Sequence, residues 1–158
     1  MNVSNLLFVC SGNTCRSPMA ALIAQDMASR LRGRLEFRSA GLMAGEGNPA
    51  SGGAVRAAAN RDLDLTEHES SPLSDADLEW ADLVLGMTHG HVDSVRSRAP
   101  DLPTVPVTGF LPNDDSLAGA SIGDPFGGPD EEYEVVWQAL ERAIDAMLQR
   151  VLGPPADE

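Results

Sequence analysis

The chain has 158 residues, 42% of them hydrophobic, and this length suits one domain with one core. Its formal net charge of −13 argues against nucleic-acid or anionic-membrane partners, because such partners bind basic surfaces. Every basic residue is an arginine, and the absence of lysine excludes Schiff-base chemistry and the phosphate-binding lysine of P-loop NTPases.

The N-terminal third of the chain predicts a strand, a tight loop and a helix. Asn5–Val9 is a continuous apolar run, typical of a strand that is buried on both faces of a parallel sheet. The run stops at Cys10, and turn residues follow it. Ser17 is expected to cap a helix whose first turn contains Pro18 and whose apolar residues recur to about Arg32.

The remaining elements alternate in type. The patterns predict strands over 35–39, 82–87 and 103–107, and helices over 54–60, 74–80, 90–98 and 130–151. Two prolines place the strand over 103–107 at a sheet edge. Ser74 with Asp77 resembles a capping box, and Asp130 is expected to cap the last helix. Residues 108–129 form a long loop, and loops of that length tend to be functional.

This alternation predicts an α/β fold around a parallel sheet. We expect a single domain over residues 1–158, with a short flexible tail from about residue 153. The apolar runs are short and no basic segment follows Met1, so neither a signal peptide nor a membrane span is expected. A cytoplasmic protein is the prediction.

The eight residues Cys-Ser-Gly-Asn-Thr-Cys-Arg-Ser, from Cys10 to Ser17, carry the chemistry. A tight loop before a helix turns its backbone N–H groups inward and makes a nest for an anion, to which the helix dipole adds positive potential. Arg16 can bind two phosphate oxygens at once. This setting favours the thiolate of Cys10, to which Ser17 can donate a hydrogen bond. The expected phosphate-binding residues are Ser11, Gly12, Asn13, Thr14, Cys15, Arg16 and Ser17.

Other interpretations of this segment are weaker. Cys10 could be a small buried hydrophobic residue, because a cysteine six residues before an arginine is by itself a permissive pattern. A dinucleotide site needs three glycines where only Gly12 is present. Cys10 and Cys15 lack the companions of a zinc site, and a disulfide between them closes too small a loop to stabilise the fold. The pair is therefore predicted to be reactive, and peroxide could join it reversibly.

Attack of Cys10 on phosphorus requires an acid that protonates the leaving group. Asp114, Asp115 and Asp124 of the long loop are the candidates. Asp124 is favoured because it precedes a stiffening proline and lies between glycines, and Phe126 could form a wall of the pocket. The alternative for Asp124 is an ordinary Asp-Pro turn. Loops after parallel strands gather at one rim of the sheet, so this segment can reach Cys10.

Four motifs together resemble the low-molecular-weight protein tyrosine phosphatase family. They are the stretches Val9–Met19, Arg38–Gly41, Ala81–Met87 and Asp124–Phe126. The resemblance implies a four-stranded parallel sheet flanked by helices on both faces, no metal or cofactor, and hydrolysis of phosphorylated proteins through a phosphocysteine. It also implies these roles: Cys10 as nucleophile, Arg16 as clamp on the transition state, Asp124 as general acid, Asn13 as brace of the loop, and Ser39 and His68 as its supporting partners.

Within that family the substrate pocket has an unusual lining. Tyrosine phosphatases commonly carry an aliphatic residue in place of Thr14, and two aromatic residues where this chain has Phe126 followed by glycine. Ser70–Leu73, Met87–His89 and Asp124–Gly128 look like segments of the bacterial protein-arginine phosphatases. A hydroxyl at residue 14 suits a polar phosphoguanidinium group better than a phosphotyrosine ring. Phosphoarginine is therefore the favoured substrate, with phosphotyrosine as the alternative.

Three further functions are weaker alternatives. Thioredoxin-coupled arsenate reductases use a similar loop but need cysteines beyond Cys10 and Cys15. A silent phosphate-binding module and a thiol redox sensor are the alternatives from another class, and turnover of para-nitrophenyl phosphate separates an enzyme from both. His68 could also be an ordinary surface histidine. A monomer is expected.

Overall fold

The computed structural model describes residues 2–31 and 33–153. Within these ranges, parallel strands alternate with helices along most of the chain, as the sequence patterns predict. The strands are β1 (Asn5–Cys10), β2 (Glu36–Gly41), β3 (Leu83–Gly86) and β4 (Thr104–Pro106). The α-helices are α1 (Arg16–Ala28), α2 (Gly52–Ala59), α3 (Asp75–Trp80), α4 (His89–Arg98) and α5 (Asp130–Leu152), and a short 3-10 helix, η1, spans Val107–Phe110.

The sheet has the strand order β2-β1-β3-β4, and all three pairs are parallel. This confirms the predicted four-stranded parallel sheet, and β4 lies at an edge as its prolines indicate. The chain leaves β1 for β2 on one side and continues to β3 on the other. Ligands of open α/β sheets bind where the strand order reverses in this way, beyond the carboxyl ends of the strands. Cys10 is the last residue of β1 and therefore lies at that point.

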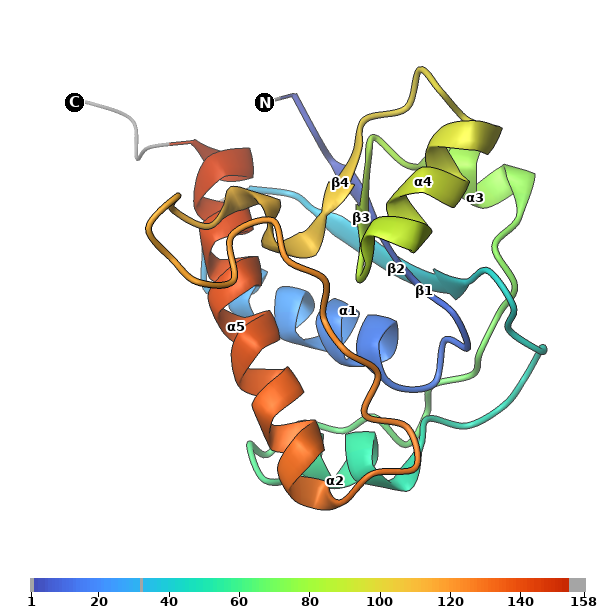
Figure 1. Cartoon of the computed structure of the whole chain (residues 1–158), viewed down its shortest axis with the longest axis vertical. Coiled ribbons are helices and arrows are strands. Elements are labelled where there is room, and N and C mark those ends of the chain that lie inside the picture. The colour runs from blue at the N-terminus through green and yellow to red at the C-terminus, as the bar shows by residue number, and fades with distance from the viewer. Residues whose placement is uncertain (1, 32, 154–158) are drawn as a thin grey trace.

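Helices cover both faces of the sheet (Figure 1), with α1 and α5 on one face and α3 and α4 on the other. Successive side chains of β1 point to opposite faces of the sheet. Leu6 and Phe8 join the larger cluster with α1 and α5, whereas Leu7 and Val9 join the smaller one. All four are fully buried, so the continuous apolar run reflects a strand with two buried faces.

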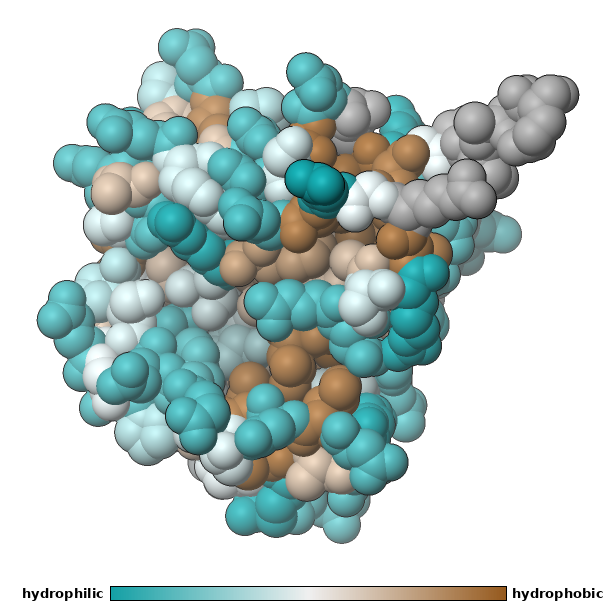
Figure 2. Space-filling model, turned by 180° about the vertical axis from the view of Figure 1, so that it is seen from behind, coloured by the Kyte–Doolittle hydropathy of each residue, from teal (hydrophilic) through white to brown (hydrophobic). Residues whose placement is uncertain are grey.

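Hydrophilic side chains dominate the face seen in Figure 2, and the hydrophobic areas there are confined to patches between them. The large apolar side chains of α5 instead pack inward, among them Trp137, Leu140 and Ile144. No helix of the described residues is long and apolar enough to cross a membrane.

Two predicted helix boundaries are wrong in detail. The first helix ends at Ala28, and Arg32, where the sequence placed its end, lies outside the described residues. The last helix begins at Asp130 itself, with Pro129 as its N-cap and no side-chain cap. The carboxylate of Asp130 binds the Arg56 guanidinium instead, at 2.9 Å. The predicted tail lies almost wholly outside the described residues, at 154–158.

Candidate active site

The predicted nucleophile sits at the base of a pocket between β1 and α1. Cys10 is 2% exposed, and its sulfur lies 2.8 Å from the Ser17 hydroxyl and 3.3 Å from the backbone N–H of Asn13. The Asn13 side-chain amide donates to the same Ser17 oxygen, at 2.8 Å. The Ser17 hydrogen is therefore directed to the sulfur. Two hydrogen-bond donors are thus aimed at the one sulfur atom that would attack phosphorus.

Ser17 was expected to cap the helix as well, and this expectation is wrong. The helix begins at Arg16, two residues before the start that a cap at Ser17 would give, and its N-cap, Cys15, makes no side-chain cap hydrogen bond. The Ser17 hydroxyl is fully buried and serves Cys10 and Asn13. Pro18 does lie in the first turn, as predicted. The N–H groups of the first turn of α1 are thus available to an anion that is bound in the loop.

Asn13 holds the loop in its tight turn. Its φ of 55° lies in the left-handed region, which a non-glycine residue adopts only when its surroundings fix it. The side-chain amide donates to Ser39 at 3.0 Å as well as to Ser17, and the side-chain oxygen accepts from the Ser71 N–H at 2.9 Å. His68 donates from Nε2 to the Asn13 carbonyl at 2.7 Å. The structure thus brings Ser39 and His68 to the residue they were expected to support.

Arg16 extends from the first turn of α1 toward the same pocket. It is 5% exposed; its Nη1 donates to the Ile122 carbonyl at 2.9 Å, and its Nη2 lies 3.6 Å from the Asp124 carboxylate. Its Nε is buried and has no hydrogen-bond partner among the described residues. A buried donor without a partner is costly, and a bound oxyanion would satisfy it. This geometry fits a guanidinium that binds a phosphate group.

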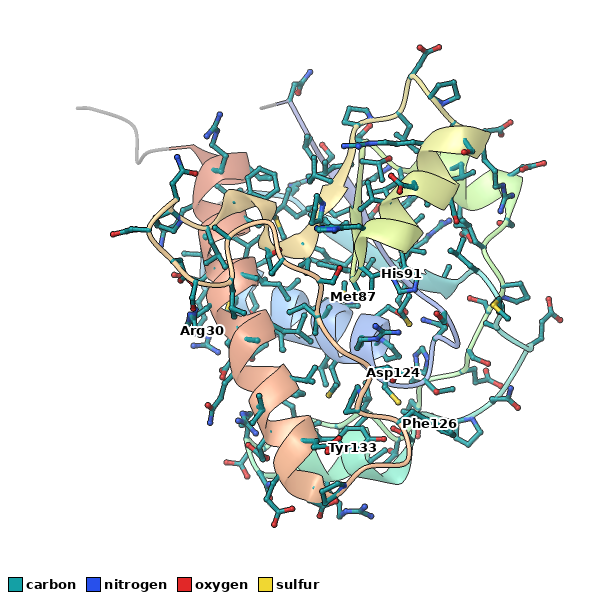
Figure 3. All side chains as sticks on the ribbon, in the orientation of Figure 1. Arg30, Met87, His91, Asp124, Phe126 and Tyr133 are labelled. Atoms are coloured by element: carbon teal, nitrogen blue, oxygen red, sulfur yellow. The ribbon has the colours of Figure 1, made fainter. Side chains whose placement is uncertain are left out.

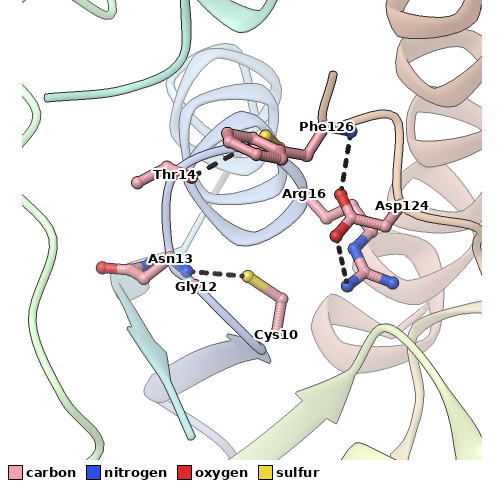
Figure 4. A pocket seen from close by; sticks show the side chains of 8 residues that line it. Cys10, Gly12, Asn13, Thr14, Arg16, Asp124 and Phe126 are labelled. Atoms are coloured by element: carbon pink, nitrogen blue, oxygen red, sulfur yellow. Dashed lines mark hydrogen bonds and ion pairs between the residues drawn. The ribbon is translucent and has the colours of Figure 1, made fainter. Parts of the chain in front are cut away.

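Asp124 alone of the three candidate acids reaches the pocket. Its Oδ1 accepts from the Phe126 N–H at 3.0 Å, which leaves Oδ2 directed toward Arg16 (Figure 4). Asp115 instead accepts from the Leu117 N–H, and Arg142 binds the same oxygen; the first of these contacts is the main cause that lowers its pKa. The pocket is lined by Asp124 and by neither Asp114 nor Asp115.

The pocket has a volume of about 170 Å³. Its lining consists of Cys10, Gly12, Asn13, Thr14, Cys15, Arg16, Asp124 and Phe126. Figure 4 shows Thr14 and the Phe126 ring at the end of the pocket opposite Cys10, where the substrate side chain would enter. Phe126 is 70% exposed, and Gly127 follows it at a φ of 80° that disfavours a second aromatic residue there.

Comparison with known proteins places this site in a family. The model of the low molecular weight phosphotyrosine protein phosphatases matches residues 5–153. The chain belongs to this family. A protein-arginine-phosphatase of Geobacillus stearothermophilus is 38% identical over 92% of this chain and 95% of its own. A probable low molecular weight protein-tyrosine-phosphatase, EpsP of Ralstonia nicotianae, is 31% identical over 94% of this chain and 97% of its own.

The solved structures agree with the family assignment. The YwlE arginine phosphatase from Geobacillus stearothermophilus superposes with a TM-score of 0.84 at 38% identity, covering 94% of this chain and 93% of that one. The chain is therefore a cysteine-dependent protein phosphatase of this family. Among the described residues, no three His, Cys, Asp or Glu side chains are grouped as a metal site would require.

The second cysteine of the loop has neighbours that the sequence did not reveal. The Cys15 sulfur lies 3.1 Å from the Ser51 hydroxyl and 3.6 Å from the Tyr133 hydroxyl. Both cysteines are free thiols in the structure. Tyr133 is buried in the core, and its hydroxyl also reaches the loop. Formation of a Cys10–Cys15 disulfide under peroxide stays a prediction.

His91 is a second residue that sequence reasoning missed. Its Nε2 lies 2.9 Å from the Ser11 hydroxyl, and it is 5% exposed. The available signal was its place four residues after Met87, in the first turn of a helix that starts at the catalytic rim. Burial, with a smaller contribution from Arg16, lowers the pKa of His91 from 6.5 to about 4.

This depressed pKa makes the protein sensitive to acid. The unfolded chain takes up the His91 proton near pH 6.5, whereas the folded protein resists it until about pH 4. The stabilisation is complete above pH 6.5 and is lost as the pH falls to about 4, up to roughly 3 kcal/mol. Urea unfolding should show this decline between pH 6.5 and 4. The H91Q variant, with no titrating group there, should show a shallower decline; an equal slope in both proteins would contradict the prediction.

Proposed function

We propose that this protein removes phosphate from phosphorylated arginine side chains of proteins. The observation that carries the proposal is the lining of the pocket mouth, where Thr14 and a single aromatic residue, Phe126, face the substrate. The names of its relatives support it, since a protein-arginine-phosphatase matches nearly the whole chain. Phosphotyrosine is the second candidate, because relatives that match equally long stretches are named tyrosine phosphatases.

The Thr14 hydroxyl is available to a polar substrate. Thr14 is half-buried, and within the described ranges its hydroxyl makes a single, long hydrogen-bond contact, 3.8 Å to the Cys15 sulfur. A phosphoguanidinium group brings N–H donors to this end of the pocket, and the hydroxyl oxygen can accept from them. A phosphotyrosine ring offers only a carbon surface there. A bound phosphotyrosine would leave the Thr14 hydroxyl without a hydrogen-bond partner, and only the exposed Phe126 would pack against its ring.

In the first chemical step, the Cys10 thiolate attacks phosphorus while the loop N–H groups and Arg16 hold the equatorial oxygens. The P–N bond breaks, its electron pair goes to the guanidine nitrogen, and Asp124 delivers the proton that this nitrogen needs. The products are a cationic arginine side chain, a phosphocysteine and an ionised Asp124. Its Oδ2 is the oxygen that can act, since Oδ1 is held by the Phe126 N–H.

In the second step, water attacks the phosphocysteine from the side that the arginine has left. Asp124, now a carboxylate, takes a proton from this water and so returns to its acid form. The S–P bond breaks, its electron pair returns to Cys10, and inorganic phosphate leaves. The Ser17 hydroxyl and the Asn13 N–H stabilise the departing thiolate, because both lie within hydrogen-bond reach of the sulfur.

The substrates in this proposal are phosphorylated proteins. The single-domain organisation, the monomeric state and the cytoplasmic location expected from the sequence remain predictions.

Changing Thr14 to Ile should shift the preference of the enzyme from phosphoarginine toward phosphotyrosine. The variant loses the hydroxyl that accepts from phosphoarginine and gains an aliphatic surface that suits a ring. One lost hydrogen bond and one unfavourable desolvation are each worth about 1–3 kcal/mol, enough for a ten- to hundredfold change. We expect T14I to lower kcat/KM for phosphoarginine peptides by that factor and to keep or raise it for phosphotyrosine peptides, measured side by side on one sequence.

The T14V variant is the matched control, since it removes the hydroxyl with little change in size. It should lose part of the phosphoarginine activity without the gain on phosphotyrosine. If both activities fall in parallel in T14I, Thr14 only braces the loop. A wild-type enzyme that already prefers phosphotyrosine would assign the second candidate function.

A further inference from the structure

His91 approaches the phosphate-binding loop from the β3 side of β1. The residues that bind Asn13 lie on the other side of that strand. It is the third residue of α4, the helix that follows β3, and Figure 3 shows it beyond the end of that strand, near Met87 and toward Asp124. The supports of Asn13 come instead from β2 and from the segment of residues 68–71. The loop is therefore held from two directions, and only one of them involves residues expected from the sequence.

The hydrogen bonds of His91 define its tautomer. The Thr88 backbone N–H donates to Nδ1 at 3.1 Å, so Nδ1 has a free lone pair and the proton of the neutral ring is on Nε2. That Nε2–H then donates to the Ser11 hydroxyl oxygen, 2.9 Å away. The two ring nitrogens have separate tasks: Nδ1 completes the capping box of α4, and Nε2 reaches the loop.

Ser11 is the residue directly after the nucleophile, and both its backbone carbonyl and its side-chain hydroxyl are hydrogen-bonded. Its carbonyl accepts from the Met43 N–H at 2.9 Å. The approach is close because β2 ends in Gly41, where an added Cβ would come within 2.5 Å of the same carbonyl oxygen. On the other side, the Ser11 side chain is held by His91. Movement of Ser11 would displace the neighbouring sulfur and the loop N–H groups that bind phosphate.

We propose that His91 is a positioning residue of this phosphatase: its Nε2–H holds the Ser11 hydroxyl and so fixes the first turn of the loop that carries Cys10. It lies outside the lining of the pocket that holds Cys10. The proposal rests on the proposed cysteine chemistry of this loop, but not on whether the substrate is phosphoarginine or phosphotyrosine.

The surroundings of His91 keep this hydrogen bond intact over the working range of pH. Burial and the nearby Arg16 guanidinium both oppose protonation of the ring, and only Asp124 favours it. A proton on Nδ1 would also face the Thr88 N–H, which needs an acceptor. The ring therefore stays neutral and donates to Ser11 from a single nitrogen.

Two amide variants separate the tasks of the two nitrogens. In H91N, the side-chain oxygen can take the place of Nδ1 and accept from Thr88, but no atom reaches Ser11. In H91Q, the longer side chain can place its N–H₂ near the position of Nε2 and donate to Ser11, while the bond to Thr88 is lost. A residue that only caps α4 would be replaced best by Asn, whereas a positioning residue would be replaced best by Gln.

The experiment measures kcat and KM for para-nitrophenyl phosphate, together with the thermal midpoint of each variant. We expect H91N to lose about tenfold in kcat with little change in KM or in the thermal midpoint, because one hydrogen bond of the loop is gone. H91Q should retain most of kcat despite a lower thermal midpoint. Retention of kcat in H91N and its loss in H91Q would overturn the proposal.

Ser11 provides a second test from the other partner, on a residue that is only half-buried. S11A should reproduce the tenfold loss, and S11A combined with H91N should lose no more than either change alone. Additive losses, or full activity in S11A, would also overturn the proposal. H89Q is the matched control on the same helix, because His89 is exposed and binds the Gly119 carbonyl rather than the loop; it should not share the coupling with S11A. A wild-type protein inactive on para-nitrophenyl phosphate would refute the proposed function itself.

Discussion

The C10S variant should lose at least about 10⁴-fold in turnover of any phosphorylated substrate, while it keeps its fold and its affinity for phosphate. Near neutral pH a serine hydroxyl is not ionised, so it is a far weaker nucleophile than a thiolate held by two donors. The loss should appear in kcat. Steady-state kinetics with a phosphoarginine peptide and with para-nitrophenyl phosphate would measure it.

The fold of C10S should persist because the new hydroxyl can use the same partners. Cys10 is buried, and its sulfur has hydrogen-bonding groups at Ser17 and at the Asn13 N–H. The loop N–H groups and Arg16 are unchanged, so calorimetric titration with inorganic phosphate should give an affinity close to that of the wild type. An unfolded variant would show neither this binding nor a cooperative thermal transition.

The C15S variant is the matched control for C10S. Both cysteines lie in the same loop, but the Cys15 sulfur faces the hydroxyls of Ser51 and Tyr133, which a serine could also bind. C15S should therefore retain measurable turnover. Substantial activity in C10S would disprove the assignment of Cys10 as the nucleophile, and complete loss in both variants would leave loop integrity, rather than nucleophilicity, as the cause.

The sequence predicted those parts of the site that follow from local patterns. A buried strand, turn residues and a helix in immediate succession fix the path of the chain from β1 to α1, and this path brings Cys10, Asn13 and Arg16 into one tight loop. The alternation of strands and helices predicts the parallel sheet. Asp124 lines the pocket with Cys10 and Arg16, as the shared rim of loops after parallel strands would allow.

The parts that could not be predicted depend on contacts between distant segments. Ser17 has the residue type of a helix cap, and only the position of Cys10 shows that its hydroxyl is used elsewhere. Asp130 likewise binds Arg56, which is 74 residues away in the chain. His91 lies in the first turn of a helix at the catalytic rim, but its sequence neighbours do not indicate that its side chain will contact Ser11.

The D124N variant should lose about 10²–10⁴-fold in kcat on phosphoarginine peptides. The guanidine nitrogen is strongly basic and is a poor leaving group without a proton, so breaking the P–N bond depends on the proton from Asp124. The nitrophenolate of para-nitrophenyl phosphate is a much better leaving group, and the loss on that substrate should be clearly smaller. The ratio of the two losses is therefore the measurement that identifies a general acid.

The amide changes little else in the structure. Its oxygen can still accept from the Phe126 N–H as Oδ1 does, so the turn over the pocket should be kept. The carboxylate is about half exposed and lies 3.6 Å from Arg16, so its loss costs little stability. A thermal midpoint within a few degrees of the wild type would support this.

D115N provides the comparison within the same loop. The Asp115 carboxylate is bound by Arg142 and the Leu117 N–H and does not line the pocket, so this variant should keep the wild-type ratio between the two substrates. Equal losses of D124N on peptide and nitrophenyl substrates would mean that Asp124 acts by placing Arg16 rather than by donating a proton. Nearly full peptide activity in D124N would require another acid, and Asp114, which is exposed on the same loop, would be the next residue to test.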